Sequence, residues 1–193
     1  MWASTENLFN VTTVAANAAR DSANAAIAAE RARFHVVIEE TNFDWVIRVV
    51  ETNYSPPIDD DAAIESPAGV NYRFRNYGKT PGIIKEISMG MSVAPDDPID
   101  PVYTVLLSPI KEHMIAGGEG QTSQKSYLMY RALSMKEARA IRSNEARLWF
   151  FGRIDYDDVF GSKHTHRFYF RSVTSGDRCF LQSYDYKHYN QST

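Results

Sequence analysis

The chain has 193 residues, with 21 basic and 24 acidic side chains, a formal net charge of -3 and a single cysteine. This length allows one domain of ordinary size and an accessory helix, and the near balance of charge argues against nucleic acid as a partner. The lone Cys179 excludes an intramolecular disulfide and a cysteine-rich zinc site, but it leaves the cellular compartment open.

Residues 3–32 predict one long helix, because they are rich in alanine and contain neither glycine nor proline. Apolar or small residues recur at alternating three- and four-residue spacings and form one narrow seam: Leu8, Val11, Ala15, Ala18, Ser22, Ala25, Ala29 and Ala32. We expect the helix to begin near Ser4 and to end at the basic Arg31 and Arg33. About 28 helical residues would be ~42 Å long, so we expect the helix to project or to pair with another helix. The alternative is a helix that lies along its own domain.

From Phe34 onward the pattern has a period of two, which predicts short antiparallel strands separated by turns. The predicted strands are residues 34–39, 43–51, 70–77, 83–93, 102–107, 124–130, 147–156 and 164–174. Residues 54–68 and 95–101 have loop composition. The three adjacent aspartates at 59–61 lack the spacing and the glycine of a calcium loop, so we interpret them as a solvated acidic segment.

The segment NYGKTPG, residues 76–82, lies between two predicted strands. Gly78 can adopt a positive φ, Pro81 restricts the backbone, and the Asn76 side chain can bond back to the turn. A phosphate-binding loop needs several glycine amides at the start of a helix, whereas a strand follows here. We therefore interpret this segment as a turn that redirects a strand.

Residues 134–143 predict the single convincing helix of the β region, with Ser134 as the N-cap and Glu137 completing a capping box. The whole pattern predicts a mainly β protein, an immunoglobulin-like antiparallel β-sandwich of about seven strands preceded by a long N-terminal α-helix. A partly open barrel is the alternative. We divide the chain into a helical stalk, residues 1–32, and a β-sandwich domain, residues 33–193.

The strands predicted at 147–156 and 164–174 form a hairpin, in which Gly161 suits a left-handed position and Phe160 can plug the turn.

His164 and His166 lie two residues apart on the second strand of this hairpin and therefore point to the same face. Asp155 or Asp157 on the partner strand could approach them, and two imidazoles with a carboxylate can bind a transition metal. Metal-assisted hydrolysis would be the corresponding enzyme chemistry. The phase also places both histidines on the face of Phe168, which favours a hydrogen-bonded pair instead.

No other catalytic or cofactor-binding pattern is present in the sequence: there is no G-x-S-x-G elbow, and Cys179 resembles an ordinary strand residue. Near the C-terminus, Tyr184, Tyr186 and Tyr189 lie among polar residues and could stack on sugars or bases. The alternative for this segment is a last edge strand with a frayed tail.

Four segments together carry a family resemblance: AERARF at 29–34, NYGKTPG at 76–82, FGRIDYDDVFG with a following H-x-H at 151–166, and YDYKHYN at 184–190. Their order resembles a widespread group of uncharacterised, proteobacterial-type membrane-anchored proteins, and the likeness spans most of the chain. The resemblance implies one or two membrane helices, an alanine-rich spacer and a compact β domain, with no established activity. No apolar run here approaches the ~20 residues of a membrane helix, and residues 1–10 do not predict a secretory signal. We expect the chain either to be truncated at its start or to be a soluble version.

We therefore expect a non-enzymatic binding or structural module without a cofactor. Its helix would hold the β domain away from a membrane or from partner copies, with a protein partner or self-association through the helix. Membrane attachment would require a segment absent from this sequence. The location is membrane-associated if the resemblance holds and cytoplasmic otherwise. A metal-dependent hydrolase using His164, His166 and Asp155 is the alternative, and a carbohydrate binder using the tyrosines is the third possibility.

Overall fold

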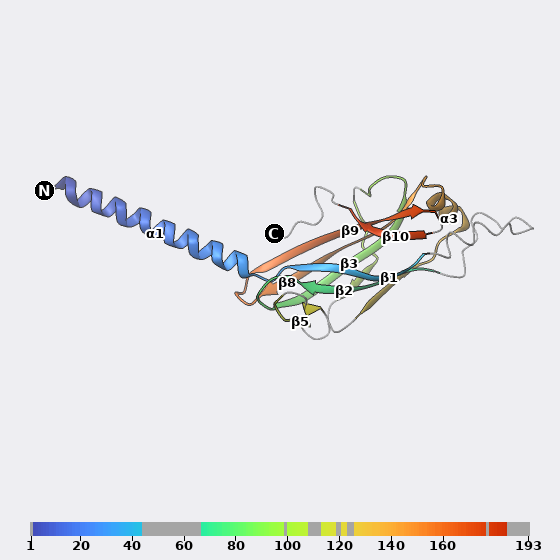
Figure 1. Ribbon diagram of the computed structural model, residues 1–193, viewed down its shortest axis with the longest axis horizontal. Helices are drawn as coiled ribbons and strands as arrows, with labels where there is room; N and C mark the ends of the chain where they lie inside the picture. The colour runs from blue at the N-terminus through green and yellow to red at the C-terminus, as the bar shows by residue number, and fades with distance from the viewer. Residues whose placement is uncertain are drawn as a thin grey trace, which may run out of the picture.

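A computed structural model describes residues 2–43, 67–98, 100–107, 113–118, 121–122, 126–176 and 178–184. Two antiparallel sheets pack face to face, and a long helix precedes them (Figure 1). This arrangement confirms the predicted mainly β, sandwich-like fold. The predicted strand at 43–51 and the acidic loop lie almost wholly outside the described residues.

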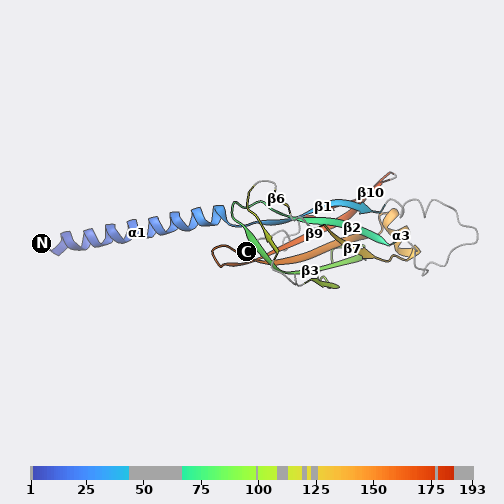
Figure 2. The same ribbon diagram turned by 90° about the horizontal axis from the view of Figure 1, so that it is seen from below.

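The helix α1 (Trp2–Glu30) extends away from the sandwich, with its N-terminus at the far end (Figures 1 and 2). Its 29 residues correspond to about 44 Å of length. Every side chain of residues 10–26 is exposed, so the alternative in which the helix lies along its own domain is wrong. The helix begins at Trp2, before the predicted N-cap Ser4, and it ends at Glu30, one residue before Arg31. Alanine-rich segments have a high helix propensity, so the helix can extend beyond the predicted cap. No helix in the described part of the chain has both the length and the hydropathy needed to span a bilayer.

The smaller sheet consists of β1 (Phe34–Asn42), β2 (Ala68–Asn76), β6 (Gln121–Thr122) and β7 (Tyr127–Arg131). The central strand β2 pairs antiparallel with β1 on one side and with β6 and β7 on the other. Its alternation is as predicted: Val70, Tyr72 and Phe74 are fully buried, and the intervening arginines lie on the outer face. The two-residue β6 was not predicted, because so short a strand shows no alternation.

The larger sheet has the order β10 (Arg178–Ser183), β9 (Lys163–Ser175), β8 (Arg147–Asp158), β3 (Gly82–Ala94) and β4 (Val105–Leu107), with β5 (His113–Ile115) also paired to β3. The strands β3 and β8 pair from Gly82 opposite Asp158 to Ala94 opposite Arg147. The helix α3 (Met135–Arg142) has both hydrogen bonds of the predicted capping box. Its buried face packs on β8 and β9.

The core between the sheets is rich in aromatic rings, and a second cluster lies on the outer face of the larger sheet. There Trp149, Phe151 and Tyr169 are each only 1 % exposed. Tyr184 packs on Trp149 and Tyr103 packs on Phe151, with ring centroids 5.7 and 6.1 Å apart. The outer face of this sheet is therefore partly covered by the chain itself.

Candidate functional site at the base of the N-terminal helix

The chain passes from solvent into the core within a few residues of the end of α1. Ile27 is half-buried, whereas Ala32 and Phe34 are almost fully buried. The Phe34 ring meets the edge of Tyr156 at 4.7 Å, and the Tyr156 hydroxyl donates to the Ala32 carbonyl at 3.2 Å. We call this region the joint: residues 27–34, residues 76–82 of the β2–β3 turn, and residues 156–164 of the β8–β9 hairpin.

Asn76 connects the β2–β3 turn to the chain that leaves α1. Its side chain is fully buried, and its Oδ1 accepts hydrogen bonds from the backbone amides of Arg33 and Gly78 at 3.0 and 2.9 Å. Its Nδ2 donates to the Thr80 carbonyl at 2.8 Å, with further carbonyls of residues 115 and 116 at 3.3 Å. One amide thus uses both its donor and its acceptor capacity to join three segments of the chain.

Thr80 caps the end of α1 from the same turn. Its backbone amide and its hydroxyl both donate to the Glu30 carbonyl at 3.0 Å. The last carbonyls of a helix have no partner within the helix, so this contact satisfies one of them. The C-terminal end of α1 is therefore capped by a residue 50 positions further along the chain.

Gly78 is required for a different reason from the one predicted. It is not among the described glycines with positive φ, which are Gly118, Gly161 and Gly176. Instead, a Cβ at residue 78 would lie 1.9 Å from the Arg31 carbonyl oxygen. The close approach of the chain leaving α1 excludes every side chain at this position.

Asp158 connects the β8–β9 turn to α1, and its side chain has no exposed surface. Its Oδ1 accepts from the backbone amides of Phe160 and Ser162, both at 2.9 Å. Its Oδ2 lies 2.8 Å from His164 Nε2 and 3.4 Å from Arg31 Nε. This carboxylate therefore holds the turn, a histidine and the end of the helix at once.

The electrostatics of Asp158 favour its charged form. Burial by itself raises the pKa of this carboxyl, but hydrogen bonds from His164, Ser162 and Phe160 outweigh it and hold the pKa below its usual value. The prediction that the Phe160 ring packs under the turn is wrong, because this side chain is 48 % exposed. The Asp158 carboxylate stabilises the turn instead, through its hydrogen bonds to the backbone amides. Gly161 has φ +80°, as the turn was predicted to need.

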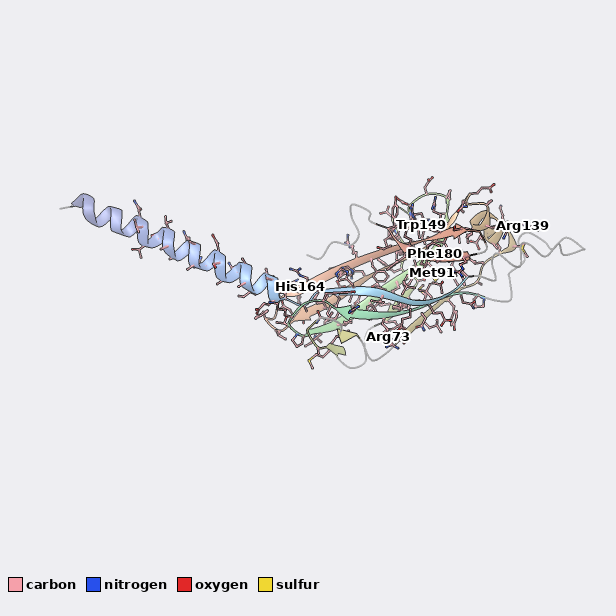
Figure 3. All side chains as sticks on the ribbon, viewed as in Figure 1. Arg73, Met91, Arg139, Trp149, His164 and Phe180 are labelled. Atoms are coloured by element: carbon pink, nitrogen blue, oxygen red, sulfur yellow. The ribbon has the colours of Figure 1, made fainter. Side chains whose placement is uncertain are left out.

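His164 and His166 point to the inner side of the larger sheet, as predicted, but they have different partners. Figure 3 shows His164 at the end of the sandwich from which α1 projects. His166 is 2 % exposed, and its ring centroid lies 5.0 Å from that of His35 on β1. Burial, together with the neighbouring His35, lowers the pKa of His166 from 6.5 to about 4, so this imidazole is neutral at physiological pH.

The structure does not bring Asp155 to these histidines. Asp155 is directly opposite Thr165, on the other face of the sheet, where it accepts from the Thr165 hydroxyl at 2.6 Å and pairs with Arg153 at 2.7 Å. Asp157 lies on that outer face too and pairs with Lys85 at 3.7 Å. No group of three metal-ligating side chains occurs in the described ranges. The three side chains predicted as metal ligands, His164, His166 and Asp155, therefore do not converge in this structure.

An open depression of about 490 Å³ is lined by residues of both faces at this end of the sheet: Lys85, Glu86, Asp155, Tyr156, Asp157, Lys163, His164 and Thr165. In this depression, the Asp155 carboxylate is paired with Arg153 and the Asp157 carboxylate is paired with Lys85. Exposed ion pairs of this kind form an ordinary solvated sheet surface.

Tyr184 is a packing residue. Its ring meets Trp149 at 5.7 Å, and the Arg171 guanidinium lies 4.4 Å from its centroid. Tyr186 and Tyr189 lie outside the described residues. The predicted tyrosine surface is therefore described only at its first member, which covers the outer cluster.

No protein-family model matches the chain, and no similar sequence is found among curated proteins. The candidate site is therefore defined by geometry, and its main residues are Arg31, Asn76 and Asp158. None of the three was predicted as a site residue. The order Asp158, Phe160, Ser162 does fit a turn in which an aspartate accepts from amides two and four residues later.

Proposed function

We propose that the protein is a non-enzymatic structural or binding module, in which α1 is a stalk that holds the β-sandwich away from its point of attachment. One observation carries this proposal: residues 10–26 are exposed throughout, and the contacts between the described residues of the sandwich and the helix lie at its C-terminal end. A helix of about 44 Å whose side chains at residues 10–26 are all exposed is suited to spacing.

The seam of α1 supports association with a second helix. Val11 is 68 % exposed and lies on the seam, and Val14, 67 % exposed, flanks it. The remaining seam positions are mainly alanine, which lets two backbones approach closely but buries little area per residue. We therefore propose that two copies pair through this seam with modest affinity, which places two sandwiches side by side to contact a protein partner.

The motif resemblance supports a further part of the proposal, that the far end of the stalk is located at a membrane. With this geometry the joint would lie roughly 44 Å from the surface if the helix stood upright. Fluorescence microscopy of the full-length gene product in its native cell would test this part separately from pairing.

The pairing is tested by measuring the mass of the full chain over a range of concentrations by sedimentation equilibrium. A double variant, Ala18→Glu with Ala25→Glu, places two charges on the seam and should convert dimers to monomers. The matched control, Asn17→Glu with Asn24→Glu, has the same charge and spacing on the opposite polar face and should leave the mass unchanged. A wild-type chain that stays monomeric at ~100 μM would remove the pairing proposal, and so would equal effects of the two variants.

A further inference from the structure

The joint holds the end of α1 from two sides. On one side, the β2–β3 turn binds the main chain through Thr80 to Glu30 and through Asn76 and Tyr77 to Arg33. On the other side, the β8–β9 turn binds the Arg31 side chain through Asp158, with Ser162 Oγ 3.5 Å from Arg31 Nη2. We propose that the Arg31–Asp158 contact fixes the direction of α1 relative to the sandwich, so that the stalk and the head turn as one body.

Backbone hydrogen bonds from a single turn would leave the helix able to swing. They hold residues 30 and 33 close to the β2–β3 turn, but all of them act from that side. The Tyr156 hydroxyl binds the carbonyl of residue 32, which lies beyond the helix end. Arg31 directly follows the last residue of the helix, and its side chain reaches Asp158 of the larger sheet, so this second contact limits the remaining rotation.

The contact between Asp158 Oδ2 and Arg31 Nε, at 3.4 Å, is an ion pair without a hydrogen bond, and the surroundings of the carboxylate strengthen it. The carboxylate is fully buried, and its position is set by the amides of residues 160 and 162 before Arg31 is considered. The charged or titratable groups that face it are Arg31 from the helix end and His164 from β9. A carboxylate held in a fixed place with little water interacts more strongly with a cation than an exposed one does. The exposed Lys79–Glu30 pair, at 4.0 Å, adds little to the joint.

This inference goes beyond the proposed function, because it concerns the joint whether or not two stalks pair. It predicts one narrow distribution of distances between the stalk and the head. Removing the charge of Asp158 should broaden that distribution while both parts stay folded.

Double electron–electron resonance on the full chain tests this prediction. Spin labels are attached at Asn17→Cys on α1 and Gln182→Cys on β10, in a Cys179→Ala background, and are diluted with unlabelled protein to suppress distances between copies. The substitution Asp158→Asn keeps the size of the side chain and an oxygen for the two turn amides, but removes the charge. We expect at least a twofold broadening of the distance distribution.

Two further variants make the result decisive. Glu137→Gln is the matched control: it neutralises the carboxylate of the Arg131–Glu137 pair at α3, far from the joint, and should leave the distribution narrow. Arg31→Met removes the contact from the partly exposed side and should reproduce the broadening even if Asp158→Asn fails to fold. A broad distribution in the wild type would overturn the inference, as would a folded Arg31→Met protein with the wild-type width. Neither result bears on the mass measurement that tests pairing.

Discussion

The stalk and the sandwich are stabilised in different ways. Residues 10–26 of α1 are exposed to solvent, so this helix depends on the intrinsic propensity of alanine and on local hydrogen bonds. In the sandwich, Tyr72, Phe74 and Phe150 have no exposed surface and depend on contacts between strands distant in sequence. The locally stabilised helix and the sandwich, which is stabilised by long-range contacts, meet at the joint. The comparison teaches that substitutions of similar size should have very different effects depending on which side of residue 30 they lie.

The largest effect is expected at the joint itself, for Gly78→Ala. Its Cβ would collide with the Arg31 carbonyl, and the backbone on both sides of the contact is held by hydrogen bonds. We expect a loss of about 3 kcal/mol in the free energy of unfolding, measured by urea denaturation. Gly69→Ala is the matched control, because its Cβ would come closest to the movable Tyr130 ring, at 3.0 Å, and would be in ordinary contact with Asn42. Equal losses in the two variants would show that the joint is not tightly packed.

The second effect belongs to the core of the sandwich and depends on pH. The histidine of an unfolded chain takes up a proton below pH 6.5, whereas the buried His166 resists protonation down to about pH 4. The unfolded state therefore binds more protons in this range, and the folded state loses stability as the pH falls. For His166 alone the loss is about 3 kcal/mol between pH 7 and pH 4.

Urea denaturation at a series of pH values measures this loss, and a His166→Leu variant should show a flatter profile over the same range. His35 on β1, which faces His166, stays in both proteins, so the difference measures His166 together with its interaction with His35. An unchanged slope in the variant would contradict the prediction.

The sequence predicted those features that depend on near neighbours. The alternation of β2 and the Ser134–Glu137 capping box are local patterns, and both are present. The joint depends on contacts such as Arg33 with Asn76 and Arg31 with Ser162, which are 43 and 131 positions apart. No spacing rule within one segment relates residues so far apart.

The histidine site shows the same limit on a smaller scale. The two-residue spacing correctly placed His164 and His166 on one face, because that follows from strand geometry alone. Whether Asp155 shares this face depends on the register of the hairpin, and a shift of one residue exchanges the faces. The observed register puts Asp155 opposite Thr165, and Asp158 beyond it becomes the partner of His164.

A smaller effect, of opposite sign, is expected at Tyr72 in the core. Within the described part of the chain its buried hydroxyl has no hydrogen-bond partner, and burial, with Tyr127 nearby, raises its pKa and keeps it neutral. Tyr72→Phe removes an unsatisfied polar group, keeps the ring contact with Phe150, and should stabilise the protein by about 1 kcal/mol. The same substitution at Tyr156, whose hydroxyl donates to Ala32, should destabilise it instead. Thermal unfolding of both variants distinguishes the signs, and a loss at both positions would mean that Tyr72 does have a partner.

The smallest effect on the sandwich is expected from Ala19→Gly in the middle of α1. Glycine costs about 1 kcal/mol of local helix stability relative to alanine, and it should lower the helical signal in far-ultraviolet circular dichroism. Residue 19 is exposed and contacts no strand, so the near-ultraviolet signal of the aromatic core should unfold at the wild-type urea concentration. A substitution that frays the stalk but leaves the head unchanged would show that the two regions are coupled only through the joint. A fall in the core midpoint matching the helix cost would mean instead that they unfold as one cooperative unit, and the contrast between local and long-range stabilisation would then not hold.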